Sequence, residues 1–275
     1  MRIFYLLVFL ISLAAPRLNA AGISVDSGLT PPLDRWIVRS QVRLTGREPI
    51  TAGAAEMDAT VVPLVVAYGL RSGVTVMLRQ AVMSREMGAM SETGLGDTFL
   101  MAKFKALRIN TRSYVFGIAP TLGLELPTGE TGLSSDTWDL RPGLFFTFRH
   151  GLWDEDLVLA YTWNGMAGES AGGVDPGDEL AINFAIARQF GLNNDFSITL
   201  APLLELSYLD VSHAELGGNP VGDTGESVIY LSPGVKLTIN SLVLEALWQN
   251  PSWQHQNGSL AERRSTVLVG ARVMF

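Results

Sequence analysis

The chain has 275 residues, 47% of them hydrophobic, and its 27 acidic and 20 basic residues give a formal net charge of −7. This acidic balance argues against a nucleic-acid partner, because such partners select clustered basic residues. The chain has no cysteine, which excludes a disulfide framework and a thiolate metal site. No low-complexity linker divides the sequence, so its length predicts one large domain.

The first twenty residues have the pattern of a secretory signal peptide. Arg2 precedes an apolar run over 3–15, and cleavage is expected near Ala20. The run is shorter than the roughly 20 residues that a spanning helix needs. We therefore expect a signal peptide over 1–20, a short periplasmic segment over 21–33 and a barrel domain over 34–275.

Beyond residue 20 the apolar residues are spread over short alternating segments. From Trp138 to Phe148, and again from Phe196 to Tyr208, large apolar residues alternate with residues that are mostly small or charged. This period of two is typical of β-strands with one face in lipid. Twelve such segments follow one another, near 34–45, 58–68, 73–83, 95–107, 113–126, 137–149, 156–164, 179–190, 195–209, 227–239, 242–249 and 264–275.

The connections between these segments alternate between short and long. Residues 69–72 and 240–241 are short connections, whereas 127–136 and 210–226 are long ones. Bacterial outer-membrane barrels have an even number of strands, short periplasmic turns and long extracellular loops. The predicted fold class is therefore all-β, a closed antiparallel transmembrane β-barrel of about 12 strands.

Aromatic residues mark both ends of the apolar face and predict girdles at the two membrane interfaces. They are Trp138, Trp163, Tyr208 and Trp248 at the long-loop ends, and Tyr114, Phe148, Phe190, Phe196 and Phe275 at the short-turn ends. The terminal Phe275 follows an alternating strand and predicts an outer-membrane assembly signal. We expect the bacterial outer membrane as the location, with its lipid, lipopolysaccharide and the barrel assembly machinery as partners.

Five prolines lie inside the predicted strands, where each removes a donor from the hydrogen-bond ladder. They are Pro63, Pro120, Pro142, Pro202 and Pro233. A closed barrel offers no free edge for such residues, so this feature counts against the predicted fold. We expect β-bulges to accommodate them.

Two patterns resemble catalytic motifs, but their surroundings argue against an enzyme. Residues 168–172 fit G-x-S-x-G around Ser170, yet the glycines and proline that follow prevent the helix of a nucleophile elbow, even though Asp210 and His255 come later in the right order. His255 also resembles the histidine of barrel phospholipases, but Asn257 occupies the place of their serine. We expect no catalytic residue and no cofactor. The three histidines lie on separate connections, so no metal site is expected.

Charged residues on the inner faces of the predicted strands are candidate lumen-lining residues. They are Arg39, Arg79, Lys103, Glu125, Arg141, Glu205, Lys236, Glu245 and Arg272. A two-residue turn at 240–241 pairs Ile239 with Leu242, which places Lys236 opposite Glu245. We expect a polar lumen crosslinked by ion pairs, which either stiffens the barrel or sets its selectivity.

Three stretches combine in a recognisable order: GLGD at 94–97, LELPTGE at 124–130 and WDLRPGL at 138–144. Together they resemble the family of outer-membrane proteins named for the MetA pathway of phenol degradation, and the resemblance covers roughly 34–275. It implies a small barrel that passes aromatic or other hydrophobic compounds. The family pattern contributes no catalytic residue.

The leading interpretation is an outer-membrane channel or transporter for small solutes with a charged lumen. A closed structural or adhesive barrel with binding loops is the alternative, and a barrel lipid hydrolase is the third class. The number of strands does not decide between the first two, because about 12 strands lie between packed eight-stranded barrels and open porins.

Overall fold

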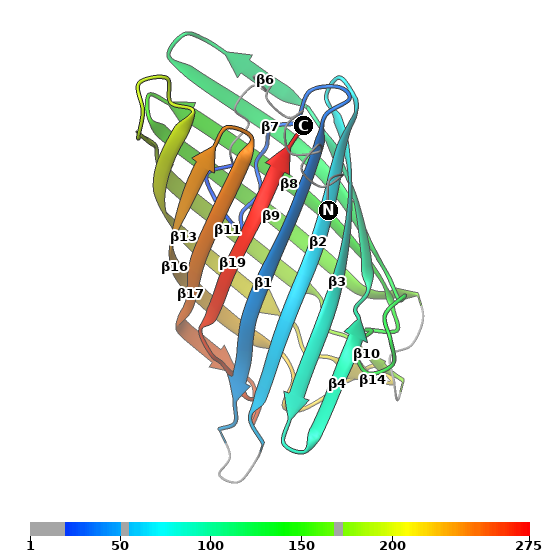
Figure 1. The fold of residues 1–275 in the computed structure, drawn as a ribbon. Helices are drawn as coiled ribbons and strands as arrows, with labels where there is room; N and C mark the ends of the chain where they lie inside the picture. The colour runs from blue at the N-terminus through cyan, green and yellow to red at the C-terminus, as the bar shows by residue number, and fades with distance from the viewer. Residues whose placement is uncertain (1–19, 51–54, 168–172) are drawn as a thin grey trace, which may run out of the picture.

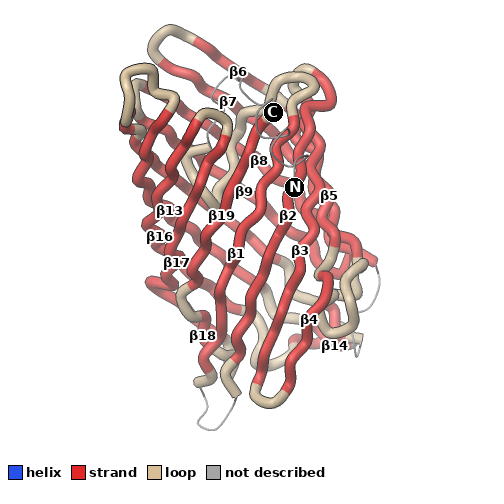
Figure 2. Tube along the Cα trace, in the orientation of Figure 1, coloured by secondary structure: helices blue, strands red, loops and turns tan. Residues whose placement is uncertain are grey.

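A computed structural model describes residues 20–50, 55–167 and 173–275, and in these residues the regular structure is all strand. The long strands form one closed antiparallel barrel (Figure 1; Figure 2). In chain order they are β1 (Trp36–Glu48), β2 (Met57–Arg71), β3 (Val74–Met87), β5 (Thr98–Phe104), β7 (Tyr114–Leu126), β8 (Trp138–His150), β9 (Trp153–Ala167), β11 (Glu179–Arg188), β13 (Ile198–Val211), β16 (Glu226–Ile239), β17 (Leu242–Gln256) and β19 (Thr266–Met274). Pairing of β1 with β19 and of β11 with β13 closes the ring. The predicted fold class, a closed barrel of twelve strands, is confirmed.

Among the described residues, four short strands pair with the barrel wall near its ends, and three others form a small separate sheet. They are β4 (Met90–Leu95), β6 (Leu107–Asn110), β10 (Val174–Asp175), β12 (Phe190–Gly191), β14 (Glu215–Leu216), β15 (Asn219–Pro220) and β18 (Glu262–Arg263). The sequence predicts loops at 46–57 and 84–94, but β1 and β3 run further and β4 pairs with the end of β3. The barrel wall therefore projects beyond the predicted strand ends on the side of the long connections.

Alternation of side chains between lipid and lumen explains why these segments form strands. In β13, Ala201, Leu203 and Glu205 are buried, while Leu204 and Leu206 between and after them are 42% and 49% exposed. The exposed apolar side chains form the outer band that a bilayer covers. Among the described residues, no helix is both long and apolar enough to cross a membrane.

The five strand prolines fall where the hydrogen-bond ladder to one neighbour is interrupted. Pairing of β1 with β2 skips from Ser40–Leu64 to Arg43–Val61, on either side of Pro63, without a change of register. Similar gaps occur beside Pro142, Pro202 and Pro233. At Pro120 the partner changes from β5 to β6, and the register shifts by one residue. The expected bulge is therefore present at Pro120, whereas the other four prolines occupy gaps in register, where no donor is needed.

The N-terminal segment differs from the periplasmic position predicted for residues 21–33. The chain leaves the barrel wall beside Gly69, whose carbonyl accepts a hydrogen bond from the Asp34 backbone. Residues before Asp34 then run inside the barrel, where Ala21, Ile23 and Val25 are buried among wall residues. Charged side chains of the wall form hydrogen bonds with the backbone of this segment, and strand patterns alone do not predict such bonds. We call residues 20–33 the plug.

The seam of the barrel generates a prediction about its assembly. The backbones of Trp36 and Phe275 donate hydrogen bonds to each other's carbonyls, with N···O distances of 2.9 and 3.0 Å. Deletion of Phe275 removes this closing pair and one exposed ring from the girdle. We expect much less heat-modifiable folded barrel on gel electrophoresis for the deletion than for Phe275→Ala, which keeps the backbone pair, or for the loop-side control His255→Ala. Equal folded fractions for the deletion and the wild type would contradict this role.

Candidate functional site

The lumen and the plug form the candidate site, because charged side chains of the wall meet the plug backbone there. The plug has no regular secondary structure, so side chains of the barrel must satisfy its buried backbone groups. Gly28 lies so close to the wall that an added Cβ would come within 2.6 Å of the Phe145 carbonyl oxygen. Glycine at this position allows the plug to reach the wall.

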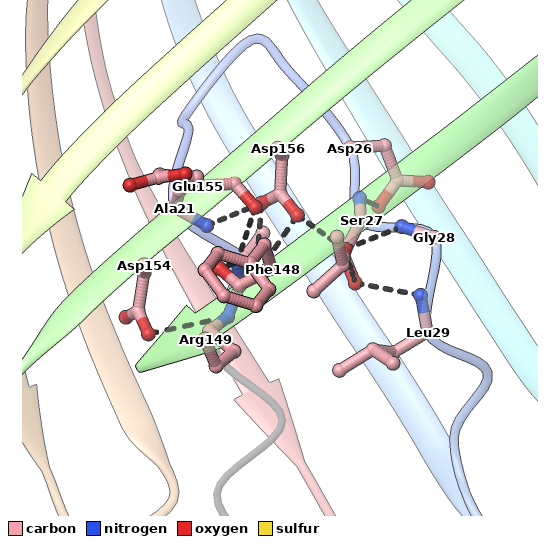
Figure 3. Close-up of polar contacts among 12 residues, drawn as sticks. Ala21, Asp26, Ser27, Gly28, Leu29, Phe148, Arg149, Asp154, Glu155 and Asp156 are labelled. Carbon is pink, nitrogen blue, oxygen red and sulfur yellow. Dashed lines mark hydrogen bonds and ion pairs between the residues drawn. The ribbon is translucent and has the colours of Figure 1, made fainter. Parts of the chain in front are cut away.

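Asp156 on β9 is the first anchor of the plug (Figure 3). Its carboxylate is buried, and it accepts a hydrogen bond from the Ala21 backbone at 2.5 Å. Arg149 on β8 donates to both of its oxygens at 3.0 Å, and Thr147 also donates to it. The Thr147 hydroxyl in turn accepts a hydrogen bond from the Gly28 backbone at 2.8 Å. One wall cluster therefore holds the plug at two positions, Ala21 and Gly28.

Glu205 on β13 is the second anchor, and it lies in the same row of the wall as Asp156, because Ala185 on β11 is the register partner of both. Its side chain is fully buried and accepts hydrogen bonds from the Ile23 and Ser24 backbones at 2.5 and 3.0 Å. The Ser24 hydroxyl donates to its other oxygen. A carboxylate that accepts several hydrogen bonds is compensated for the loss of water.

Lys103 on β5 forms the third anchor and is buried. Its ammonium donates to the Asp26 carboxylate at 2.9 Å and to the Ser27 carbonyl at 2.7 Å. Burial alone would raise the pKa of Asp26, but the charge of Lys103 and its hydrogen bond lower it below the ordinary value. Asp26 is therefore ionised at neutral pH and pairs with Lys103.

The predicted lumen-lining residues form ion pairs, bind the plug or do both, as Arg39 does when it also donates to the Ile23 carbonyl. Arg39 pairs with Glu245 at 2.6 Å, Arg79 with Glu125 at 2.9 Å, and Arg141 approaches Glu179 at 3.8 Å. Glu205, Lys103 and Lys236 contact the plug. Arg272 lies beside the lumen cavity. The structure thus brings these residues into one polar interior.

The register predicted from the 240–241 turn is confirmed, because Lys236 and Glu245 are Cα partners. The ion pair expected between them is not formed. Lys236 instead donates to the carbonyls of Ala20 and Ala21, while Glu245 accepts hydrogen bonds from Arg39 and from Gln41 at 2.7 Å. Lys236 binds the plug carbonyls, which the strand pattern did not predict, and Arg39 pairs with Glu245 instead.

The sequence analysis missed Asp154, Asp156 and Arg149 as site residues. Asp154 and Asp156 stand two apart on β9, so they share a face, and both are buried. Arg149 on the neighbouring strand lies within 3.2 Å of Asp154 and 3.0 Å of Asp156. Asp154, Asp156 and Val158 stand at alternate positions of β9. Starting the predicted strand before residue 156 would have placed both carboxylates on the lumen face.

The stretches that carry the family resemblance meet at the long-connection end of the barrel. Asp97 accepts hydrogen bonds from the backbones of Gly129 and Ser135 at 2.8 and 2.7 Å, and from the Ser134 hydroxyl at 2.8 Å. Burial would raise the pKa of Asp97, but these hydrogen bonds lower it below the ordinary value. The Glu130 backbone also donates to the Leu95 carbonyl. The family stretches therefore fasten one loop to the barrel rim.

The hydrolase motifs gain no catalytic geometry from the described residues. Ser170 lies outside them, so the G-x-S-x-G pattern has no structural account. His255 is exposed on β17 and not in a loop, and its register partner is Ser227 on β16. Within the described parts of the chain, no group of three His, Cys, Asp or Glu side chains is arranged to hold a metal ion.

The Arg39–Glu245 pair generates a prediction about stability. We expect Glu245→Lys to lower the free energy of unfolding by about 3–5 kcal/mol, because it leaves Arg39 beside a second cation in a buried setting. Adding Arg39→Glu should restore much of the loss, whereas adding Lys236→Glu should not. The midpoint of thermal unfolding in detergent measures each variant.

The matched control is Glu92→Lys, which breaks the exposed pair of Arg85 and Glu92 (side chains 40% and 43% exposed). An exposed pair of this kind contributes about 0–1 kcal/mol. If Glu245→Lys and Glu92→Lys shift the unfolding midpoint equally, the buried pair does not have the assigned role.

Comparisons with known proteins agree with this geometry. The family model described as "Putative MetA-pathway of phenol degradation" matches residues 49–254. The fold is similar to the COG4313 outer membrane channel from Pseudomonas putida F1, with a TM-score of 0.70 and 13% identity over 92% of this chain and 100% of that one.

Two further barrels overlap less well. The β domain of the Bordetella autotransporter BrkA has a TM-score of 0.48 and 11% identity, over 89% of this chain and 100% of that one. The KdgM porin has a TM-score of 0.47 and 13% identity, over 87% and 99%. No curated protein matches the chain. The closed barrel with an apolar outer band is a bacterial outer-membrane fold, and the match over residues 49–254 shows that the chain belongs to the family of the MetA pathway of phenol degradation.

Proposed function

We propose that this chain is a channel for small solutes across the outer membrane, and that the plug controls its opening. The observation that carries the proposal is how the plug is attached. Within the described residues it pairs with no strand of the wall, and side chains such as Asp156, Glu205 and Lys103 hold it. Such contacts can be exchanged for water while every ladder of the barrel stays intact.

The character of the lumen supports passage of solutes better than a purely structural barrel. A barrel of this size that served only as an anchor would gain more from an apolar interior, because buried ion pairs contribute little net stability. Here the interior holds at least five arginine–carboxylate pairs, among them Arg39–Glu245, Arg79–Glu125 and Arg149–Asp156. Polar lumen walls are typical of barrels that pass water-soluble compounds.

The solute class is part of the proposal and rests on the family. The description of the family concerns phenol degradation, which supports aromatic compounds as the class to test.

A channel needs no reacting group, and we propose that the chain is not an enzyme. A barrel whose loops bind a partner is the alternative function, and it requires no movement of the plug.

A reversible crosslink tests whether the plug controls the channel. The hydroxyl oxygens of Ser27 in the plug and Thr147 in the wall lie 3.3 Å apart. The chain has no cysteine, so two introduced cysteines can pair only with each other. We expect the double variant Ser27→Cys/Thr147→Cys to show few open events in planar bilayers when oxidised, and to regain them after reduction. Deletion of residues 22–30 should give a larger and more lasting conductance.

The control crosslink joins two positions that do not touch the plug. The hydroxyls of Ser84 on β3 and Thr93 on β4 lie 2.9 Å apart on the outer side, so Ser84→Cys/Thr93→Cys should conduct alike when oxidised and reduced. If deletion of the plug leaves the protein without conductance, the channel function is wrong and the alternative of a closed binding barrel is favoured.

A further inference from the structure

A cavity of about 250 Å³ lies in the lumen between the plug and the wall. Among the described residues that line it, cations greatly outnumber acids. Six are cationic, namely Arg39, Arg43, Arg79, Lys103, Arg141 and Arg272, and Asp26 is the one carboxylate. The chain as a whole carries a net charge of −7, so this concentration of positive charge is local to the cavity.

Three of these cations, Arg39, Arg79 and Arg141, have a carboxylate partner outside the cavity lining, whereas Lys103 pairs with Asp26 in the lining. Glu245 lies 2.6 Å from Arg39, and Glu125 lies 2.9 Å from Arg79. These partners hold the guanidinium groups in place. Asp26 is then the one described carboxylate on the side that faces the cavity.

Two of the arginines that line the cavity have no carboxylate within 4.0 Å among the described residues. Arg43 donates from Nε and Nη2 to one amide oxygen, Oε1 of Gln41, at 3.1 and 2.8 Å. Arg272 has a buried Nη2 atom without a hydrogen-bond partner, and its Cα partner across the seam is another cation, Arg39. A buried donor without an acceptor is costly, and like charges opposite each other repel. An anion in the cavity would relieve both penalties.

Most of the remaining wall of the cavity is apolar and partly aromatic. Met77, Met101, Phe99 and Phe145 line it. The Arg79 guanidinium lies 4.7 Å from the centre of the Phe99 ring, and the Lys103 ammonium lies 5.2 Å from that of Phe145. Apolar and cationic surfaces therefore stand next to each other in one small space.

We propose that this cavity binds a small organic anion, one carboxylate on an apolar body, as the preferred solute of the channel. The carboxylate would accept hydrogen bonds from Arg43 and Arg272, since a guanidinium group matches two carboxylate oxygens. The apolar body would lie against Met77 and Phe99. A volume of about 250 Å³ lies below the ~300–1,000 Å³ of pockets for drug-sized ligands, which restricts the solute to one ring or a short chain. This inference rests on the proposed channel function but concerns binding, which can be measured without transport.

Fluorine NMR on the complete mature protein in detergent tests the site. The probes are 4-fluorobenzoate and its neutral counterpart 4-fluorobenzamide, each compared with micelles alone. We expect saturable broadening for the benzoate and none beyond the micelle background for the benzamide. Arg43→Gln should weaken benzoate binding about tenfold, because it removes a guanidinium group without orphaning a carboxylate.

The matched control is Arg85→Gln, which removes an arginine of the outer rim that lies outside the cavity and pairs with the exposed Glu92. It should bind benzoate like the wild type. Equal binding of benzoate and benzamide, or equal affinities of Arg43→Gln and Arg85→Gln, would overturn the inference. Absence of benzoate binding in a protein that conducts would overturn it too, while leaving the channel function in place. Binding without conductance after deletion of the plug would instead reject the channel.

Discussion

Carboxylates buried inside the barrel need hydrogen-bond partners, and this need determines how the plug and the charged wall are arranged. Asp156 and Glu205 are 1% and 0% exposed, and a charge so far from water is costly unless hydrogen bonds replace its hydration. Wall residues supply only part of these bonds. Backbone groups of the plug supply the others, from Ala21, Ile23 and Ser24. The plug and the charged wall therefore stabilise each other, and neither is satisfied alone.

This mutual dependence is compatible with the proposed release of the plug. Strand pairing would fix the plug with a ladder of hydrogen bonds, each costly to break without water. Side-chain anchors differ, because water that enters an opened lumen can solvate Asp156, Glu205 and the plug backbone together. The barrel itself does not depend on the plug, since β1 and β19 close the ring through their own ladder. The wall is thus closed by strand pairing, whereas side chains hold the plug.

The lumen separates its charges in a way that the net charge conceals. Glu125 and Glu245 pair with arginines but do not line the cavity, whereas the arginines do. An acidic chain can therefore present a positive interior to a solute. The long-connection end is fastened by Asp97, which joins the stretches that carry the family resemblance. Those stretches belong to the shape of the rim and not to the cavity, so the family pattern does not define the solute.

The sequence by itself determined the barrel, because alternation between lipid and lumen leaves a period of two in most of the strands, although β2 is apolar on both faces. It also determined the register of Lys236 and Glu245, since a two-residue turn leaves one way to pair the flanking strands. Tertiary structure alone decided the interior. Ion pairs depend on which long side chains reach each other over an intervening strand, so Glu245 on β17 binds Arg39 on β1 past β19, although the two residues are 206 apart in sequence. The plug left no periodic pattern, because its backbone is held by distant side chains and not by neighbours in a ladder.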